Sequence, residues 1–576
     1  MVRLRHPGSA QVLCDQGLFR ATSALQILSG LGKVFAEGLT GVIGAAQASD
    51  ALGTMEAAAG DTPFMGTEPV NQVEVFISHT WGSARWQKYM SMCYFLNLGL
   101  AVKATAIVWL LAITSLALSQ VSILCGQEYL FPIITELPLL VFFMFFFFGQ
   151  HFCGQLWAPS FWLDKLCIHQ TKEELKAQQV AALPVFVARS SRMLVLWDDS
   201  YFERLWCNME MATFAKYSES PEKMEFLPLW LAPWLLSSML LDLLGVTLLR
   251  LTETFLTSEE HVEVAIKYGE MLFGESYEVS VFCHSFLEVF PDFVCYLPVA
   301  LPTLLSFRNK IQAHKLMLEQ MATFEFRNAK CSVEADRPLV EEQIALHFQP
   351  DQDTEVIVAG SSENAEQEVE PRALRAESLE RFNNYVQGPL RAVVLDCIGD
   401  THDVPLYLCY LCFLPMTTYN AVTVSPVAFA ECFSSAKTFG FSSRLDMCIC
   451  FGLAFVLAQL LAYPVTFPVL LHLLHKVERV SEAFSIRLLL GVIASGFAYA
   501  YAFFCSGIIW GATFVLWQRF TPGRLVAYIL VIAILVLQLW FFFGRRRRAF
   551  GSCRCVEYKG GEDSKPFLAV HCYDGA

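Results

Sequence analysis

Long apolar runs alternate with polar blocks along this chain. A helix needs about 20 mostly apolar residues to cross the hydrocarbon core of a bilayer, and several runs approach or exceed that length. The clearest runs cover residues 104–124, 130–149, 446–471, 487–515 and 525–543, and weaker ones cover 231–249, 285–306 and 405–426. The pattern predicts a multi-pass α-helical membrane region of about eight spans.

The polar blocks near residues 70–100 and 150–225 have the pattern of a soluble α/β domain. VEVFISHTW, which begins at Val73, is an apolar and β-branched run that ends in polar residues, as a buried parallel strand does. FWLDKLCIHQ and SSRMLVLW predict two more strands, each followed by a helix, and MEFLPLW is a candidate fourth strand. Strands that alternate with helices indicate a parallel sheet. We expect adjacent parallel strands at residues 73–79, 161–164 and 193–198.

Two apolar runs separate the two parts of this domain. A single span would leave the parts on opposite sides of the bilayer, whereas two spans return the chain to its starting side, so that the sheet can close. Lys and Arg residues flank this hairpin on the domain side, and its connecting loop has neither. By the positive-inside rule the domain lies in the cytosol. The same reasoning, with four arginines at 545–548 after the last run, predicts that both termini are cytosolic.

These patterns divide the chain into eight segments. The expected segments are a disordered or weakly helical N-terminal segment (1–70), the first part of the α/β domain (71–100), a transmembrane hairpin (104–149), the second part of the α/β domain (155–230), a second membrane hairpin with an acidic outer segment (231–306), a cytosolic helical and linker region (307–403), a four-span bundle (404–543) and a basic cytosolic tail (544–576). Within the helical region, DRPLVEEQIALHF predicts an amphipathic helix that packs on the α/β domain or on the membrane surface.

Composition supports a membrane protein and narrows the choice of partners. The 576 residues are 55% hydrophobic and 17% charged, with a mean hydropathy of +0.44, which is too apolar for a soluble protein of this size. The net charge of −14 argues against nucleic acid, whose binding needs dense Lys and Arg. The 19 cysteines are scattered, and no ligand pairs stand at zinc spacing. We therefore expect an integral protein of a lipid bilayer, with no metal site.

One segment resembles a known family. SSRMLVLWDDSYFERLWCNMEM, which begins at Ser190, resembles the Toll/interleukin-1 receptor (TIR) domain, in which a strand is followed by a tyrosine, a Trp-Cys pair and a glutamate. VEVFISHTW resembles the first strand of that domain, and FWLDKLCIHQ is similar to its second, with Asp164 at the usual acidic position. The chain has His79 and Thr80 where the family has a basic residue. The resemblance implies a TIR-like, flavodoxin-like sheet that is split by a transmembrane hairpin, an arrangement similar to that of multi-pass proteins of protists.

The resemblance also implies a reaction. TIR domains that are enzymes cleave the nicotinamide–ribose bond of NAD, and the position of their essential glutamate corresponds to Glu210. A carboxylate can stabilise the oxocarbenium-like charge that develops as this bond breaks. The residues expected to bind NAD are Ser78, Trp81, Asp164, Tyr201 and Trp206, with the aromatic rings of Trp81 and Tyr201 placed to pack against the bases. NAD would be the substrate, and no cofactor is expected.

Three functions remain open from the sequence. The first is a membrane-anchored TIR-like signalling protein that hydrolyses NAD. The second is a non-catalytic TIR scaffold that self-associates or recruits other TIR domains, in which Glu210 is a structural carboxylate. The third is a transporter or channel with a TIR-like regulatory domain, for which Asp242 and Asp292 in the weaker apolar runs are the candidate polar sites. The sequence does not identify the membrane.

Overall fold

The chain forms two compact units. The first, here called the α/β unit, comprises residues up to 97, 147–233 and 313–397, and the second, the helical unit, comprises 98–146, 234–312 and the chain from 398. The computed structural model describes residues 16–36, 64–119, 130–153, 158–218, 220–256, 259–274, 276–331, 333–349, 366–424, 441–480 and 483–544. The described residues end at Gly544, so the rest of the predicted basic tail lies outside them.

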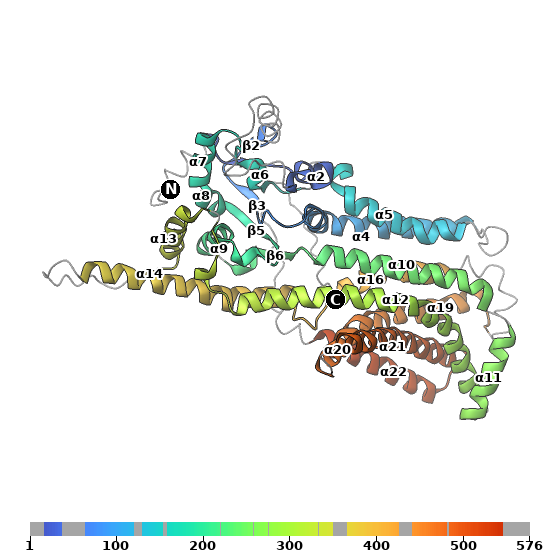
Figure 1. Cartoon of the computed structure of the whole chain (residues 1–576). Coiled ribbons are helices and arrows are strands. Elements are labelled where there is room, and N and C mark those ends of the chain that lie inside the picture. Colours follow the sequence, from blue (N-terminus) through green and yellow to red (C-terminus); the bar gives the residue numbers. More distant parts are fainter. Residues whose placement is uncertain are drawn as a thin grey trace. The chain divides into compact units, whose positions relative to one another are not determined.

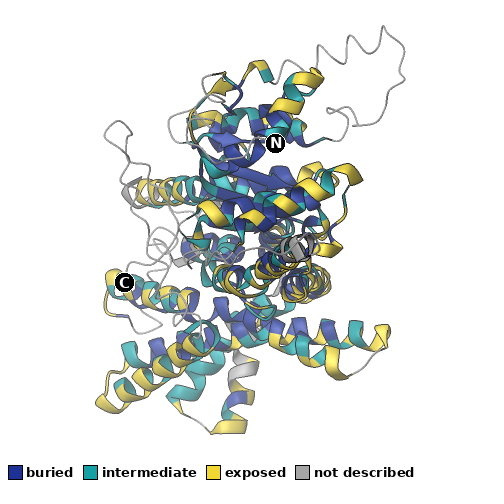
Figure 2. Cartoon of the chain, turned by 90° about the vertical axis from the view of Figure 1, so that its left-hand side faces the viewer, coloured by how far each residue is buried: buried dark blue, intermediate teal, exposed yellow. Residues whose placement is uncertain are grey.

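A parallel sheet of four strands, in the order β4, β3, β5, β6, forms the centre of the α/β unit (Figure 1). The strands are β3 (Val73–His79), β4 (Phe161–Trp162), β5 (Ser190–Trp197) and β6 (Met224–Pro228). Their side chains are mostly buried, as Figure 2 shows in dark blue, which is the pattern of a parallel sheet covered on both faces. The prediction of three adjacent parallel strands is confirmed, and the candidate fourth strand joins them at the β5 edge.

The sheet joins two segments that are far apart in the sequence. β3 precedes helix α4 (Arg85–Ser119), whereas β4 and β5 follow helix α5 (Leu130–Cys153). In the register of the sheet, Phe76 lies opposite Trp162 on one side and Met193 on the other. The rings of Phe76 and Trp162 stack with 4.5 Å between their centroids, so side-chain packing reinforces the backbone pairing. The α4–α5 hairpin is therefore an insertion between two paired strands.

Helices complete the α/β unit. They include α6 (Asp164–Cys167), α7 (Glu173–Ala181), α8 (Leu183–Ala188), α9 (Leu205–Tyr217), α13 (Arg337–His347) and α14 (Glu366–Tyr385). The amphipathic helix expected from DRPLVEEQIALHF is α13, and it packs on α9. The Thr213 hydroxyl lies 3.3 Å from His347 Nε2, and the ring of Tyr217 meets His347 edge-on. The sequence left open whether this helix packs on the α/β domain or on the membrane surface, and the structure shows it packed on the α/β domain.

The N-terminal segment is more ordered than expected. β1 (Arg20–Ala21) pairs with β2 (Glu68–Pro69), and α2 (Ala24–Gly32) begins with a capping box. Thr22 and Phe161 exchange two backbone hydrogen bonds, of 2.8 and 3.0 Å. The segment expected to be disordered or weakly helical over 1–70 thus contains two short strands as well as a helix in its described residues, 16–36 and 64–70. Their order comes from packing against distant residues, which weak local periodicity does not reveal.

Seven stretches of the described chain are long and apolar enough to cross a membrane, which supports a multi-pass membrane protein. They are Arg85–Ser115, Thr135–Cys153, Leu231–Leu251, Tyr277–Ala322, Leu445–Val480, Phe484–Gln518 and Pro522–Phe543. The helices that form them, besides α4 and α5, are α10 (Leu231–Leu256), α12 (Tyr277–Ala322), α19 (Arg444–Leu461), α20 (Thr466–Val480), α21 (Phe484–Gln518) and α22 (Pro522–Phe543). Between α10 and α12 lies α11 (Glu259–Phe273).

The expected span at 405–426 is not among these stretches. Its described residues form two short helices, α16 (Leu406–Cys412) and α17 (Leu414–Val424), with Phe413 at the break. Pro415 explains the break, because its ring clashes with the carbonyl of the preceding turn and it has no N–H to donate. The described chain therefore offers seven candidate spans, where the sequence predicts about eight.

A carboxylate from α10 caps the second of these short helices. Asp242 Oδ2 accepts the backbone N–H of Met416 at 2.9 Å, and Asp242 Oδ1 accepts the hydroxyl of Tyr296 at 2.5 Å. Asp242 is buried and lies near the middle of the stretch Leu231–Leu251. A helix start without water needs such a partner, because an unpaired N–H in hydrocarbon is costly. These contacts give Asp242 a structural role within the helical unit.

Gln179 provides a test of how the N-terminal segment is held. Its buried amide donates to the carbonyls of Leu18 and Cys167 at 3.0 and 2.9 Å, and its Oε1 accepts the backbone N–H of His169 at 2.8 Å. We expect Gln179→Leu to lower the free energy of unfolding by about 3 kcal/mol, because three buried polar groups lose their partner. Denaturant unfolding measures this loss. The exposed neighbour Gln178→Leu is the control, and an equal effect of both variants would contradict the assignment.

Candidate functional site

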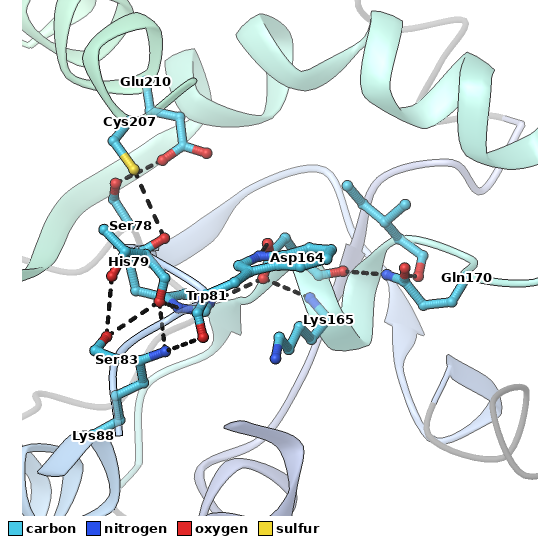
Figure 3. Close-up of polar contacts among 12 residues, drawn as sticks. Ser78, His79, Trp81, Ser83, Lys88, Asp164, Lys165, Gln170, Cys207 and Glu210 are labelled. Carbon is cyan, nitrogen blue, oxygen red and sulfur yellow. Dashed lines mark hydrogen bonds and ion pairs between the residues drawn. The ribbon is translucent and has the colours of Figure 1, made fainter. Parts of the chain in front are cut away.

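Polar side chains gather at the carboxyl ends of the two central strands (Figure 3). β3 ends at His79 and continues into Trp81, and Asp198 follows the end of β5. Helix α9 meets the same edge, where the Cys207 thiol lies 3.8 Å from the carbonyl oxygen of His79. In parallel α/β sheets, ligands bind outside the carboxyl ends of the strands. This edge is therefore the candidate site.

Glu210 is connected to the sheet through a chain of hydroxyls. The Ser78 hydroxyl donates to Glu210 Oε2 at 2.6 Å, and Ser78 Oγ lies 2.8 Å from the hydroxyl oxygen of Tyr201. Ser78 and Tyr201 are fully buried, whereas Glu210 keeps part of its surface exposed. Figure 3 shows the Glu210 side chain pointing from α9 towards Ser78. A strand, the turn after β5 and a helix thus each contribute one residue to this group.

The surroundings of Glu210 keep it protonated at neutral pH. Burial is the main cause and raises the pKa of the carboxyl from 4.5 to about 8. The hydrogen bond from Ser78 acts in the opposite direction and lowers the pKa, because it favours the ionised form. The negative charge of Asp164 adds a smaller upward effect. A carboxyl with a pKa this close to physiological pH can exchange a proton under working conditions.

Asp164 is the centre of a second group. Its Oδ1 lies 3.1 Å from His79 Nε2 and accepts the backbone N–H of Lys165 at 2.7 Å, and its Oδ2 accepts the Trp81 indole N–H at 2.5 Å. Burial alone would raise the pKa of Asp164, but the charge of His79 and these hydrogen bonds together hold it below its usual value. Lys165 also lies over the Trp81 ring, 5.2 Å from its centroid. Asp164 therefore remains a carboxylate and fixes the indole ring.

A buried lysine fixes the loop that carries Trp81. Lys88, on the first turns of α4, is fully buried, and its ammonium donates to the carbonyls of Thr80 and Trp81. The Thr80 hydroxyl in turn donates to Asp198 and lies 3.0 Å from the Ser83 hydroxyl. The loop after β3 is thus tied both to α4 and to the end of β5.

The structure brings together five of the six candidate residues, in two groups. Ser78, Tyr201 and Glu210 form one group, and Trp81 and Asp164 belong to the other. Trp206 lies one helical turn before Glu210 and is partly exposed, but it takes part in neither group of hydrogen bonds.

Two basic residues of this site, His79 and Lys88, are not among the residues that the sequence predicts for it. His79 is buried and bonded to Asp164, which lies 85 positions away. Lys88 is one of the Lys and Arg residues that flank the hairpin on the domain side. Its place between apolar positions at the start of an amphipathic helix is a signal that could have been used, since a lysine there must find partners inside the fold.

Neither a metal ion nor a thiolate is indicated by the described residues of this site. Among the residues that the structure describes, no three His, Cys, Asp or Glu side chains are placed to bind a metal ion. Burial, followed by the charges of Glu210 and Asp198, raises the pKa of Cys207 well above that of a free thiol.

Comparison with known proteins gives no match to any family model, curated protein or solved structure. The chemistry of the site therefore has to be argued from its own residues.

The raised pKa of Glu210 predicts a specific dependence of stability on pH. Between about pH 4.5 and pH 8 the unfolded carboxyl is ionised while the folded one is protonated, so this residue's contribution to stability falls as pH rises. We expect Glu210→Gln, which cannot ionise, to gain stability relative to the wild type from pH 5 to pH 8. Denaturant unfolding at several pH values measures the difference. If the free energy of unfolding changed with pH by the same amount in both proteins, the raised pKa of Glu210 would be contradicted.

Proposed function

We propose that this protein is a membrane-anchored, TIR-like signalling protein whose α/β unit hydrolyses NAD at the nicotinamide–ribose bond. One observation carries the proposal: Glu210 is a carboxyl of raised pKa, partly exposed at the carboxyl edge of a parallel sheet and bonded to the buried Ser78. Carboxyls perturbed in this way are concentrated at catalytic sites. The resemblance of the α9 segment to TIR enzymes supplies the reaction.

The proposed step uses the ionised form of Glu210. The bond from the ribose carbon to the nicotinamide nitrogen breaks, its electron pair leaves with the nicotinamide, and water then adds to the ribose carbon and loses a proton. A carboxylate beside the ribose stabilises the positive charge that develops there. The nicotinamide ring of NAD is itself positively charged, so its binding would lower the pKa of Glu210. Trp81, held by Asp164, offers an aromatic ring for stacking.

A non-catalytic scaffold is the second candidate. The hydrogen bonds among the site residues favour it, because they satisfy these side chains without a ligand. The Ser78, Tyr201 and Glu210 side chains are bonded to one another, and Asp164 has three donors within the fold. Each group therefore has a structural role without any ligand. Under this proposal the α/β unit would assemble with its own copies or with other TIR domains.

Nicotinamide release by the full-length protein in lipid vesicles tests the first proposal. We expect release by the wild type, and a loss of about 100-fold or more in Glu210→Gln, which keeps the size of the side chain but not its charge. The rate should rise with pH towards 8, since the carboxylate is the active form. Ser78→Ala should move that rise to higher pH, because it removes the hydrogen bond that lowers the pKa of Glu210.

Matched measurements separate the two candidates. Glu222→Gln, an exposed carboxyl of the same unit, should release nicotinamide at the wild-type rate. If the wild type never releases nicotinamide at any pH while the wild type and Glu210→Gln cluster equally in the membrane, the enzymatic proposal fails and the scaffold stands.

A further inference from the structure

The helical unit contains a cavity that the proposed function does not use. Its volume is about 210 Å³, and it lies between α4 and the α16–α17 pair. One face of α4 lines it with Val102, Thr105, Ala106 and Trp109, and Leu411 and Leu414 lie opposite. An engineered apolar cavity of ~150 Å³ is large enough to bind benzene. This cavity can therefore accept an apolar group of several carbon atoms.

Two polar groups on the α4 wall have no partner. Thr105 is 3% exposed, and neither its hydroxyl nor the indole N–H of Trp109 makes a hydrogen bond within the described chain. The hydroxyls on the opposite wall are satisfied, since Thr417 donates to the carbonyl of Phe413 at 2.8 Å and Thr418 to that of Pro415 at 2.9 Å. Unpaired donors are costly where no water is present. The wall therefore presents two donors, one helical turn apart, towards an apolar space.

We propose that this cavity binds an acyl chain of an ester-linked phospholipid, whose ester carbonyl accepts hydrogen bonds from Thr105 and Trp109. An N–H can only donate, and a carbonyl oxygen has two lone pairs, so one acceptor satisfies both groups. The other lining residues are apolar except Thr417 and Thr418, whose hydroxyls are already bonded within their own helix, so these walls suit the chain itself.

The position of the cavity along α4 fits the same ligand. Lys103 is exposed and stands at the start of the apolar run, which is the level of the lipid headgroups for a lysine that flanks a span. Thr105 is two residues further along, at the level where ester groups lie, and Trp109 is one turn deeper. The bound lipid would lie between α4 and the α16–α17 pair and contact both, close to the break at Phe413. This inference is independent of the proposed activity.

An ether-linked lipid provides a direct test, because it has the same chains and headgroup without the carbonyl. The full-length protein is purified in a mild detergent, and binding of diacyl and dialkyl phosphatidylcholine is measured by native mass spectrometry and by the shift in unfolding temperature. We expect the wild type to prefer the diacyl lipid on the order of tenfold, as two neutral hydrogen bonds allow. Thr105→Val with Trp109→Phe, which removes both donors, should bind the two lipids equally.

Two controls decide between the lipid and a packing defect. Thr114→Val changes an exposed threonine of the same helix and should keep the preference. In the absence of lipid, Thr105→Val alone should unfold at or above the wild-type temperature, because it removes an unpaired buried donor and keeps the shape of the side chain. Equal binding of both lipids by the wild type, a preference that survives in the double variant, or displacement of the lipid by an equal amount of a sterol would each overturn the proposal.

Discussion

The pairing of β3 with two strands that lie beyond the apolar α4–α5 hairpin is the constraint on which the α/β unit depends. β3 supplies Ser78 and His79, and the segment after β5 supplies Tyr201. Because parallel strands bring their carboxyl ends to one edge, the register that sets Ser78 opposite Val195 also sets the hydroxyls of Ser78 and Tyr201 within reach. Both candidate groups of the site exist only if the hairpin returns the chain to its starting side.

Buried polar groups need hydrogen-bond partners in both units, and the two units supply these partners in different ways. At the sheet edge the demand is met within the fold, and Lys88 and Asp164 are held by backbone and side-chain contacts. In the helical unit, Asp242 meets it by capping the N–H of Met416 after the break at Phe413. Glu210 accepts a hydrogen bond from Ser78, yet burial still raises the pKa of its carboxyl to about 8.

Local patterns predicted the elements well and their partners poorly. The β-branched run from Val73 and the pair of apolar runs that returns the chain to its starting side were enough to predict a closed parallel sheet. The two short helices around Phe413 could have been expected from Pro415, but the length of the apolar run outweighed that one residue. The order of the N-terminal segment could not have been expected, because it rests on contacts such as the stacking of Phe19 on Phe186 across more than 160 positions.

The hairpin can be understood as an enlarged crossover connection. Parallel neighbours such as β3 and β4 cannot be joined by a tight turn and need a connection that includes a helix. α4 begins as that helix and continues without interruption through Ser119, and α5 brings the chain back towards β4. Lys88 on the first turns of α4 holds the carbonyls of Thr80 and Trp81, so the long apolar helix that opens the insertion also fixes the loop of the candidate site.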